Sequence, residues 1–139
     1  MPELYLGASS NIKNISIPEG FKSIGSMAFS NSGIESITFP NSLEKIGNFA
    51  CNECQSLTRV YFGNGIRDIG TAAFEGCQSI ERVSIPNISG WCTVDTGIHS
   101  SPFHNYADLY NGEERITNLV IPASAHYIRA HAFKQCRSL

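Results

Sequence analysis

Cysteine is the residue type in this sequence whose spacing most directly suggests chemistry. Cys51 and Cys54 form a C-x-x-C motif, a spacing that serves thiol–disulfide exchange or supplies half of a tetrahedral zinc site. The sequence has no second C-x-x-C to complete four ligands, and Cys54 has equivalents at Cys77 and Cys136. A recurring cysteine is explained more simply as a small apolar core residue. We predict buried, reduced thiols and no metal, although a Cys54–Cys77 disulfide is geometrically conceivable.

A second group of candidate ligands lies in residues 87–115 and could be drawn as a metal site: Cys92, Asp95, His99, His104 and Asp108. Their spacing matches no known ligand pattern. The same segment carries four aromatic residues, which are Trp91, Phe103, Tyr106 and Tyr110. We interpret these aromatics as a satellite core under a long loop, with contacts to a ligand as the alternative. The Asn111-Gly112 pair predicts a tight turn of type I′.

No arrangement of residues in the sequence indicates catalysis. A nucleophile with a base, a phosphate-binding loop and a pair of carboxylates at fixed spacing are all absent from the sequence. We therefore predict a protein that is not an enzyme and that has no cofactor.

The elements that position these residues are repeats. One apolar string occurs five times, at residues 12–18, 34–40, 57–63, 80–86 and 116–122. The intervals between copies are 22, 23, 23 and 36 residues, so the last contains an insertion of about 13 residues within the 87–115 segment. We expect strands near 12–17, 34–39, 57–62, 80–85 and 116–121.

The spacing within each copy predicts a strand followed by a turn. Ile15-Ser16-Ile17 alternates as a half-buried strand does, and the proline that follows ends the strand because it cannot donate to a ladder. An Ile-Gly pair then supports a reversal, since glycine tolerates positive φ. An Ala-Phe pair and a cysteine follow at helical spacing. Each repeat therefore predicts one coil, and stacked coils pair their strands in parallel at ~4.8 Å.

Composition excludes several classes of partner. The 139 residues are 42% hydrophobic and 16% charged, with a net charge of −2, which suits a folded domain. A net charge of this sign does not provide the basic surface that proteins use to bind nucleic acid. No apolar run approaches the ~20 residues of a membrane-spanning helix. The N-terminus also lacks the pattern of a secretory signal.

The repeat resembles the BspA type of leucine-rich repeat from residue 12 to residue 139, and its clearest copy is Ile69-Gly70-Thr71-Ala72-Ala73-Phe74-Glu75-Gly76-Cys77. Trp91 and the Asn-Gly-Glu turn at 111–113 resemble a variant insertion of that family. The resemblance implies an α/β repeat: a single right-handed solenoid domain of about five repeats over residues 1–139. Its parallel sheet would lie on the concave face, with short helical or 3₁₀ turns and strands elsewhere. The pattern departs from the family at Cys51, Gly63 and Arg129.

The resemblance also implies a surface-displayed or secreted protein that binds another protein or a host or matrix glycoprotein. The alternative is a purely structural spacer. Because the array stops in mid-repeat, we expect a piece of a longer array, or end-to-end self-association through uncapped repeats.

Outward strand residues are the candidate contacts on the sheet, and five of them could meet a partner: Arg59, Tyr61, Arg82, Ser84 and Asn118. We expect one outward column to run through Asn14, Ser36, Arg59, Arg82 and Asn118. We expect the other to run through Ser16, Thr38, Tyr61, Ser84 and Val120. The buried column between them should contain Ile15, Ile37, Val60, Val83 and Leu119.

Overall fold

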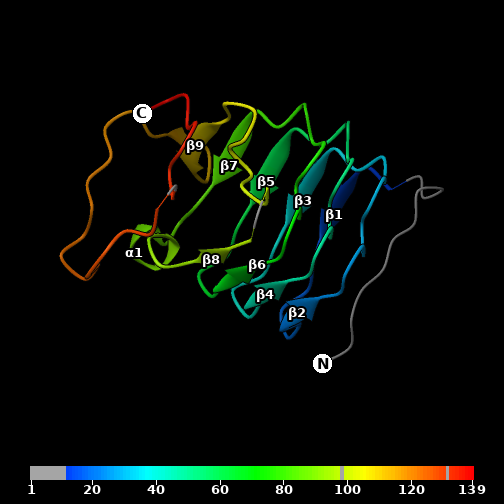
Figure 1. The fold of residues 1–139 in the computed structure, drawn as a ribbon, viewed down its shortest axis with the longest axis horizontal. Helices are drawn as coiled ribbons and strands as arrows, with labels where there is room; N and C mark the ends of the chain where they lie inside the picture. The colour runs from blue at the N-terminus through cyan, green and yellow to red at the C-terminus, as the bar shows by residue number, and fades with distance from the viewer. Residues whose placement is uncertain (1–11, 98, 131) are drawn as a thin grey trace.

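The structure is a computed structural model that describes residues 12–97, 99–130 and 132–139. The chain winds into stacked coils whose strands form two sheets (Figure 1). The architecture is a parallel-strand solenoid with one four-residue helix, α1 (Ile88–Trp91), among the described residues. The expected repeat solenoid is therefore confirmed.

The long sheet carries the strands that the repeats predict. Its parallel part runs through β1 (Asn14–Ser16), β3 (Ser36–Thr38), β5 (Arg59–Tyr61), β7 (Arg82–Ser84) and β9 (Asp108–Asn111). The short β10 (Glu114–Arg115) pairs antiparallel to β9 at its edge. For the first four strands the register is the expected one, with Ile15, Ile37, Val60 and Val83 side by side.

The second sheet is formed where the Ile-Gly pairs recur and, in the fourth coil, where Thr96-Gly97 takes their place. It contains β2 (Ser23–Ile24), β4 (Lys45–Ile46), β6 (Asp68–Ile69) and β8 (Asp95–Thr96), all parallel. Each of these strands has only two residues, and in the first three the isoleucine is buried. The spacing within each copy predicted one strand per coil, whereas the family resemblance implied strands elsewhere, and the second sheet places them at these positions.

The fifth rung of the long sheet differs from the expected one. Val83 pairs with Leu109 of β9, and no strand forms in residues 116–121. Leu109 follows Val83 by 26 residues, close to the 23-residue repeat, whereas Leu119 follows it by 36. The segment taken as an insertion therefore closes a coil of its own, and the Asn111-Gly112 turn then reverses the chain into β10.

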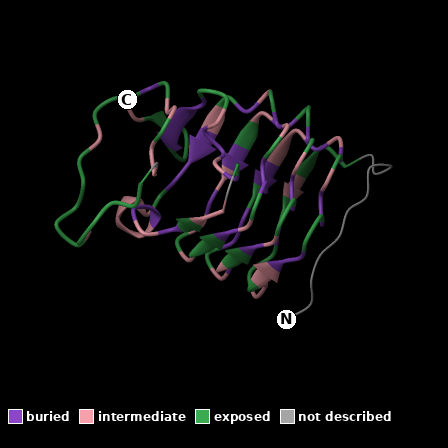
Figure 2. Ribbon diagram, in the orientation of Figure 1, coloured by how far each residue is buried: buried purple, intermediate pink, exposed green. Residues whose placement is uncertain are grey.

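The core lies between the two sheets and continues through every coil (Figure 2). Ile37, Val60, Val83 and Leu109 are at most 1% exposed. Two members of the expected column are corrected, since Ile15 at the first rung is half-buried and Leu119 only packs against the rim of the core. Burial of such a continuous apolar column is the main stabilising contribution in a stacked array.

Glycines after the buried isoleucines serve close packing and do not supply positive φ. A Cβ built on Gly47 would lie 2.7 Å from the backbone nitrogen of Ser26, and one on Gly70 would lie 2.6 Å from that of Asn48. The positive φ values fall instead at coil corners, such as 57° at both Phe49 and Glu53. The expectation that the Ile-Gly pair provides a positive-φ reversal is therefore wrong.

Candidate interaction surface

The outer face of the long sheet brings several of the predicted contact residues together. Arg59 of β5 pairs in register with Arg82 of β7, so the two side chains are neighbours on one face. Tyr61 lies two residues along β5 and is half-buried. The Arg59 side chain is exposed and forms no hydrogen bond or ion pair within the described part of the chain. One guanidinium on this face is therefore open to a partner.

Glu113 at the β9–β10 turn reaches the same place. The Tyr61 hydroxyl donates to Glu113 Oε1 at 3.3 Å, and Arg82 Nη1 donates to Glu113 Oε2 at 3.4 Å. The turn is fixed by the backbone N–H of Gly112, which donates to the Ser84 hydroxyl at 2.7 Å. Partial burial, followed by the Glu113 carboxylate, raises the pKa of the Tyr61 phenol. Sequence reasoning placed a turn here but did not assign Glu113 to the surface.

Arg82 is further held by an aromatic ring. Its guanidinium carbon lies 4.8 Å from the centre of the Tyr110 ring, within the range of a cation–π contact. Tyr110 is 9% exposed, so its ring packs beneath the Arg82 guanidinium on the side away from solvent. We call Arg59, Tyr61, Arg82, Tyr110 and Glu113 the arginine patch.

A buried carboxylate lies beside the patch. Asp108, in register with Arg82, has a side chain that is 8% exposed and accepts a hydrogen bond from Arg115 Nε at 3.0 Å. Arg137 donates to both of its oxygens. Hydrogen bonds from Arg137, with help from Arg115, lower the pKa of Asp108 to about 2. A hollow of about 350 Å³ lies here, lined by Glu81, Arg82, Asp108, Tyr110 and Arg137.

Two predicted contacts on the sheet are corrected. Ser84 is 4% exposed, and its hydroxyl accepts a bond from the turn, so it cannot meet a partner directly. Asn118 is exposed but lies outside any strand, because Asp108 takes its place beside Arg82. Tyr110 likewise replaces Val120 beside Ser84. The shifted fifth rung accounts for the placement of Asn118 and Val120.

The aromatics of the 87–115 segment divide between core and surface. Trp91 and Phe103 are 3% and 0% exposed and belong to the main core. The Trp91 ring lies 5.0 Å from that of Phe62 and 6.3 Å from that of Phe103, and its Nε1 donates to the Ala132 carbonyl at 2.8 Å. Packing therefore explains this pair, whereas Tyr106 is 58% exposed.

The cysteines form a buried ladder rather than a reactive site. Cys51, Cys54, Cys77 and Cys92 are buried and Cys136 is half-buried, all as free thiols. The thiol of Cys77 donates to the Cys51 carbonyl at 2.9 Å, and that of Cys54 donates to the Phe29 carbonyl at 3.0 Å. Burial raises the pKa of the Cys51 thiol. The described residues contain no cluster of three or more side chains that could hold a metal ion.

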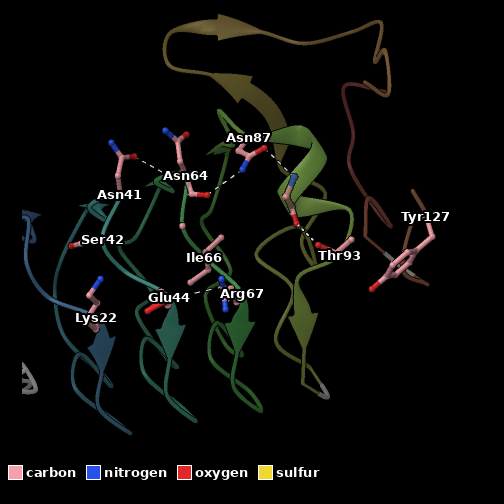
Figure 3. Close-up of a pocket in the computed structure, with 12 residues that line it drawn as sticks. Lys22, Asn41, Ser42, Glu44, Asn64, Ile66, Arg67, Asn87, Thr93 and Tyr127 are labelled. Atoms are coloured by element: carbon pink, nitrogen blue, oxygen red, sulfur yellow. Dashed lines mark hydrogen bonds and ion pairs between the residues drawn. The ribbon is translucent and has the colours of Figure 1, made fainter. Parts of the chain in front are cut away.

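A polar groove follows the coil edges that lie after the prolines (Figure 3). It has a volume of about 570 Å³, and the side chain of Tyr127 lies at one end of it. Asn41 Oδ1 accepts from the backbone N–H of Asn64 at 2.9 Å, and Asn87 Nδ2 donates to the Asn64 carbonyl at 3.1 Å. Glu19 extends this ladder by accepting from the backbone N–H of Asn41 at 2.8 Å. The sequence signal for this ladder is a polar residue directly after each strand's final proline, or after Gly63 in the third copy.

These asparagines join neighbouring coils, so the groove has a structural explanation. The backbone N–H groups of Asn41 and Ser42 hold the pKa of the Glu19 carboxyl below its ordinary value. Satisfying backbone groups at coil corners is required because the coils offer them no sheet partner there. None of the predicted contact residues lines this groove.

Comparison with known proteins agrees with the fold. Residues 106–139 match the BspA type leucine rich repeat region (6 copies). No curated protein matches the chain. A leucine rich repeat protein from T. pallidum is similar, with a TM-score of 0.51 and 26% identity over 60% of this chain and 41% of that one. A leucine rich cell surface protein from Faecalibacterium prausnitzii gives a TM-score of 0.58 and 24% identity over 97% of this chain and 32% of that one. This chain thus spans less than half the length of either.

Proposed function

We propose that this chain, whose leucine-rich repeats are of the BspA type, is a non-catalytic recognition module that binds another protein through the arginine patch. The single observation that carries the proposal is the pairing of Arg59 with Arg82 on adjacent strands while only Arg82 has an acidic partner. Like charges directly opposite each other on a sheet are destabilising. A surface that retains such a pair is better explained by a partner than by stability.

The chemistry of the patch suits an interface. Arginine and tyrosine are enriched among the residues that dominate binding energies. Tyr61 supplies half-buried aromatic area on the patch, and the buried Tyr110 ring supports the Arg82 guanidinium from behind. The short parallel strands beneath them are fixed by the coils on both sides, so little conformational entropy is lost when a partner docks.

The proposed setting is the cell surface or the extracellular space, with another protein or a host or matrix glycoprotein as the partner. One similar solved structure is described as a cell surface protein, which supports this setting. No helix among the described residues is long and apolar enough to cross a membrane.

A structural spacer is the second candidate, and one observation favours it. Apolar side chains are exposed in the segment after β10, where Val120 is 75% and Ile128 51% exposed. A further coil or a second copy stacked there would bury them. In that case the coils would extend a stalk and the arginine patch would have no ligand.

Paired charge-removal variants distinguish the two candidates. Arg59→Ser combined with Arg82→Ser removes the patch, whereas Lys45→Ser combined with Arg67→Ser removes two exposed positive charges near the second sheet. Each protein is tested for binding to a panel of immobilised matrix and serum glycoproteins, with thermal melting as the folding control. We expect the patch variant alone to lose binding and to melt unchanged or slightly higher. If the two double variants bind the panel equally well, the arginine patch is rejected as the binding site and the spacer is favoured.

A further inference from the structure

We infer that the arginine patch binds an acidic peptide segment of its partner, and that Glu113 occupies the carboxylate site until such a segment displaces it. This inference rests on the proposed function and adds the chemical class of the partner. It follows from the way in which the turn at Gly112 places a carboxylate of this chain on the patch.

Glu113 shows what the patch can bind. One of its oxygens accepts from the Tyr61 hydroxyl and the other accepts from Arg82, at 3.3 and 3.4 Å. A carboxylate between a phenol and a guanidinium is the arrangement that the side chain of a partner Asp or Glu would reproduce. Charge-assisted bonds of this kind are stronger when they shorten to ≈ 2.7–2.9 Å.

The intramolecular contact is weak enough to be replaced. The Glu113 side chain is 78% exposed, and both of its contacts are long. An ion pair in such an exposed position contributes little, since water and salt screen it. Arg82 itself stays in place without Glu113, because the Tyr110 ring lies beneath its guanidinium. The site is therefore already formed when the carboxylate leaves.

Arg59 provides the second anchor. It is adjacent to Arg82 across the strand pair and has no acidic partner in the described residues. A peptide with consecutive acidic residues could place one carboxylate on Arg82 and Tyr61 and the next on Arg59. A lone Glu113 satisfies only the first of these positions, so an acidic segment gains a contact that the turn cannot make.

The neighbouring carboxylate Asp108 does not compete for this role. Its oxygens are already bound by Arg115 and Arg137, and its side chain is 8% exposed. Arg115 and Arg137 are both bound to Asp108, so of the four arginines around the patch Arg59 and Arg82 are the two that a partner can engage.

The test uses a fluorescent hexaglutamate peptide, with hexaglutamine and a sulfated oligosaccharide as comparison probes. Glu113→Ala is compared with Glu114→Ala, which removes the same charge from the same hairpin at an exposed residue with no side-chain bond in the structure. We expect hexaglutamate to bind the Glu113→Ala variant about two- to fivefold more tightly than the wild type, the range set by an exposed ion pair. Glu114→Ala should change the affinity less, and Arg59→Ser with Arg82→Ser should abolish binding.

Each other outcome overturns the inference. Equal tightening by Glu113→Ala and Glu114→Ala would show general electrostatics without displacement. Binding of the sulfated oligosaccharide in preference to hexaglutamate would show that the patch recognises a glycan and not an acidic peptide. Absence of hexaglutamate binding in both the wild type and the Glu113→Ala variant would reject an acidic partner. If Arg59→Ser with Arg82→Ser still weakens binding to a matrix glycoprotein in that case, the proposed function stands and only the partner class is wrong.

A titration followed by NMR locates the bound peptide. The side-chain signals of Arg59 and Arg82 should shift when hexaglutamate is added. Shifts confined to Arg115 and Arg137 would place the peptide outside the arginine patch and overturn the inference.

Discussion

Arg137 donates two hydrogen bonds to Asp108, from Nε to Oδ1 at 2.9 Å and from Nη2 to Oδ2 at 2.8 Å. The pair joins the C-terminal segment to β9, the strand that closes the fifth rung. The backbone N–H of Arg137 also donates to the Ala107 carbonyl at 3.0 Å. The segment after β10 is therefore attached to the sheet by side-chain and backbone contacts together.

The first prediction concerns the pH dependence of this attachment. The pKa of Asp108 is about 2 in the folded protein, below the value of ~3.9 expected for an unfolded chain. A carboxyl whose pKa is lowered by folding stabilises the protein above its unfolded pKa, and that contribution is lost as the pH falls towards the folded pKa. Asp108→Asn should therefore melt well below the wild type at pH 5 and approach it near pH 2. The exposed Asp68→Asn serves as the control, and a difference that persists unchanged at pH 2 would contradict the prediction.

The second prediction concerns the buried column. Val60 is 1% exposed, between Ile37 and Val83. Val60→Asp would bury a carboxylate without a partner, at a cost of several kcal/mol, which is comparable with the ~5–15 kcal/mol that stabilises a typical domain. We expect circular dichroism to show an unfolded chain at room temperature. Thr38→Asp, on the outward face of β3, should remain folded, and wild-type melting of Val60→Asp would refute the register.

The repeat made the stack of coils predictable from the sequence, because each copy carries the same apolar spacing. The register of Ile37, Val60 and Val83 followed directly. The fifth rung did not, since the string at 116–122 matches the repeat better than Asp108-Leu109-Tyr110 does. Leu109 follows Val83 at nearly the repeat interval and pairs with it, whereas pairing with Leu119 would leave ten more residues to be accommodated outside the coil.

The candidate site was predictable only in part for a similar reason. The pairing of Arg59 with Arg82 follows from the period of the repeat. Glu113 and Tyr110 enter the patch because the hairpin folds back over the sheet, a contact spanning 52 residues between Tyr61 and Glu113. Glu35 lies nearer in the sequence, immediately before β3, but its carboxylate lies 3.9 Å from Lys13 Nζ.

The third prediction concerns the thiols. Cys54 and Cys77 are fully buried and donate to backbone carbonyls. A thiol reagent can therefore reach either sulfur only after the stacked coils open. A maleimide reagent should leave both unmodified in the native protein and label them after denaturant is added. Half-buried Cys136 should react before either. Rapid native labelling of Cys54 would show that the ladder is not formed.

The fourth prediction uses the packing of glycines between coils. A Cβ on Gly47 would lie 2.7, 2.8 and 2.9 Å from backbone atoms of Ser26, Gly25 and Ile24. Backbone atoms of the preceding coil cannot rotate away as a flexible side chain can, so β2 and β4 would have to separate. Gly47→Ala should therefore lower the melting temperature by several degrees, as a loss of ~1–3 kcal/mol from overpacking implies.

Gly33→Ala is the matched control for this effect, because a Cβ there meets only Lys13 Nζ, at 4.0 Å, and the residue has no positive φ. That variant should melt at or slightly above the wild-type temperature, since alanine restricts the unfolded chain.

The need for glycine at the Gly47 position of each coil, the glycine column, also explains the course of the last copy of the repeat. Arg129 stands where Gly47, Gly70 and Gly97 stand in earlier coils, and it binds the carbonyls of Cys92 and Thr93 instead of extending the second sheet. If Gly47→Ala and Gly33→Ala melt alike, close approach does not select glycine in this column, and the departure at Arg129 needs another cause.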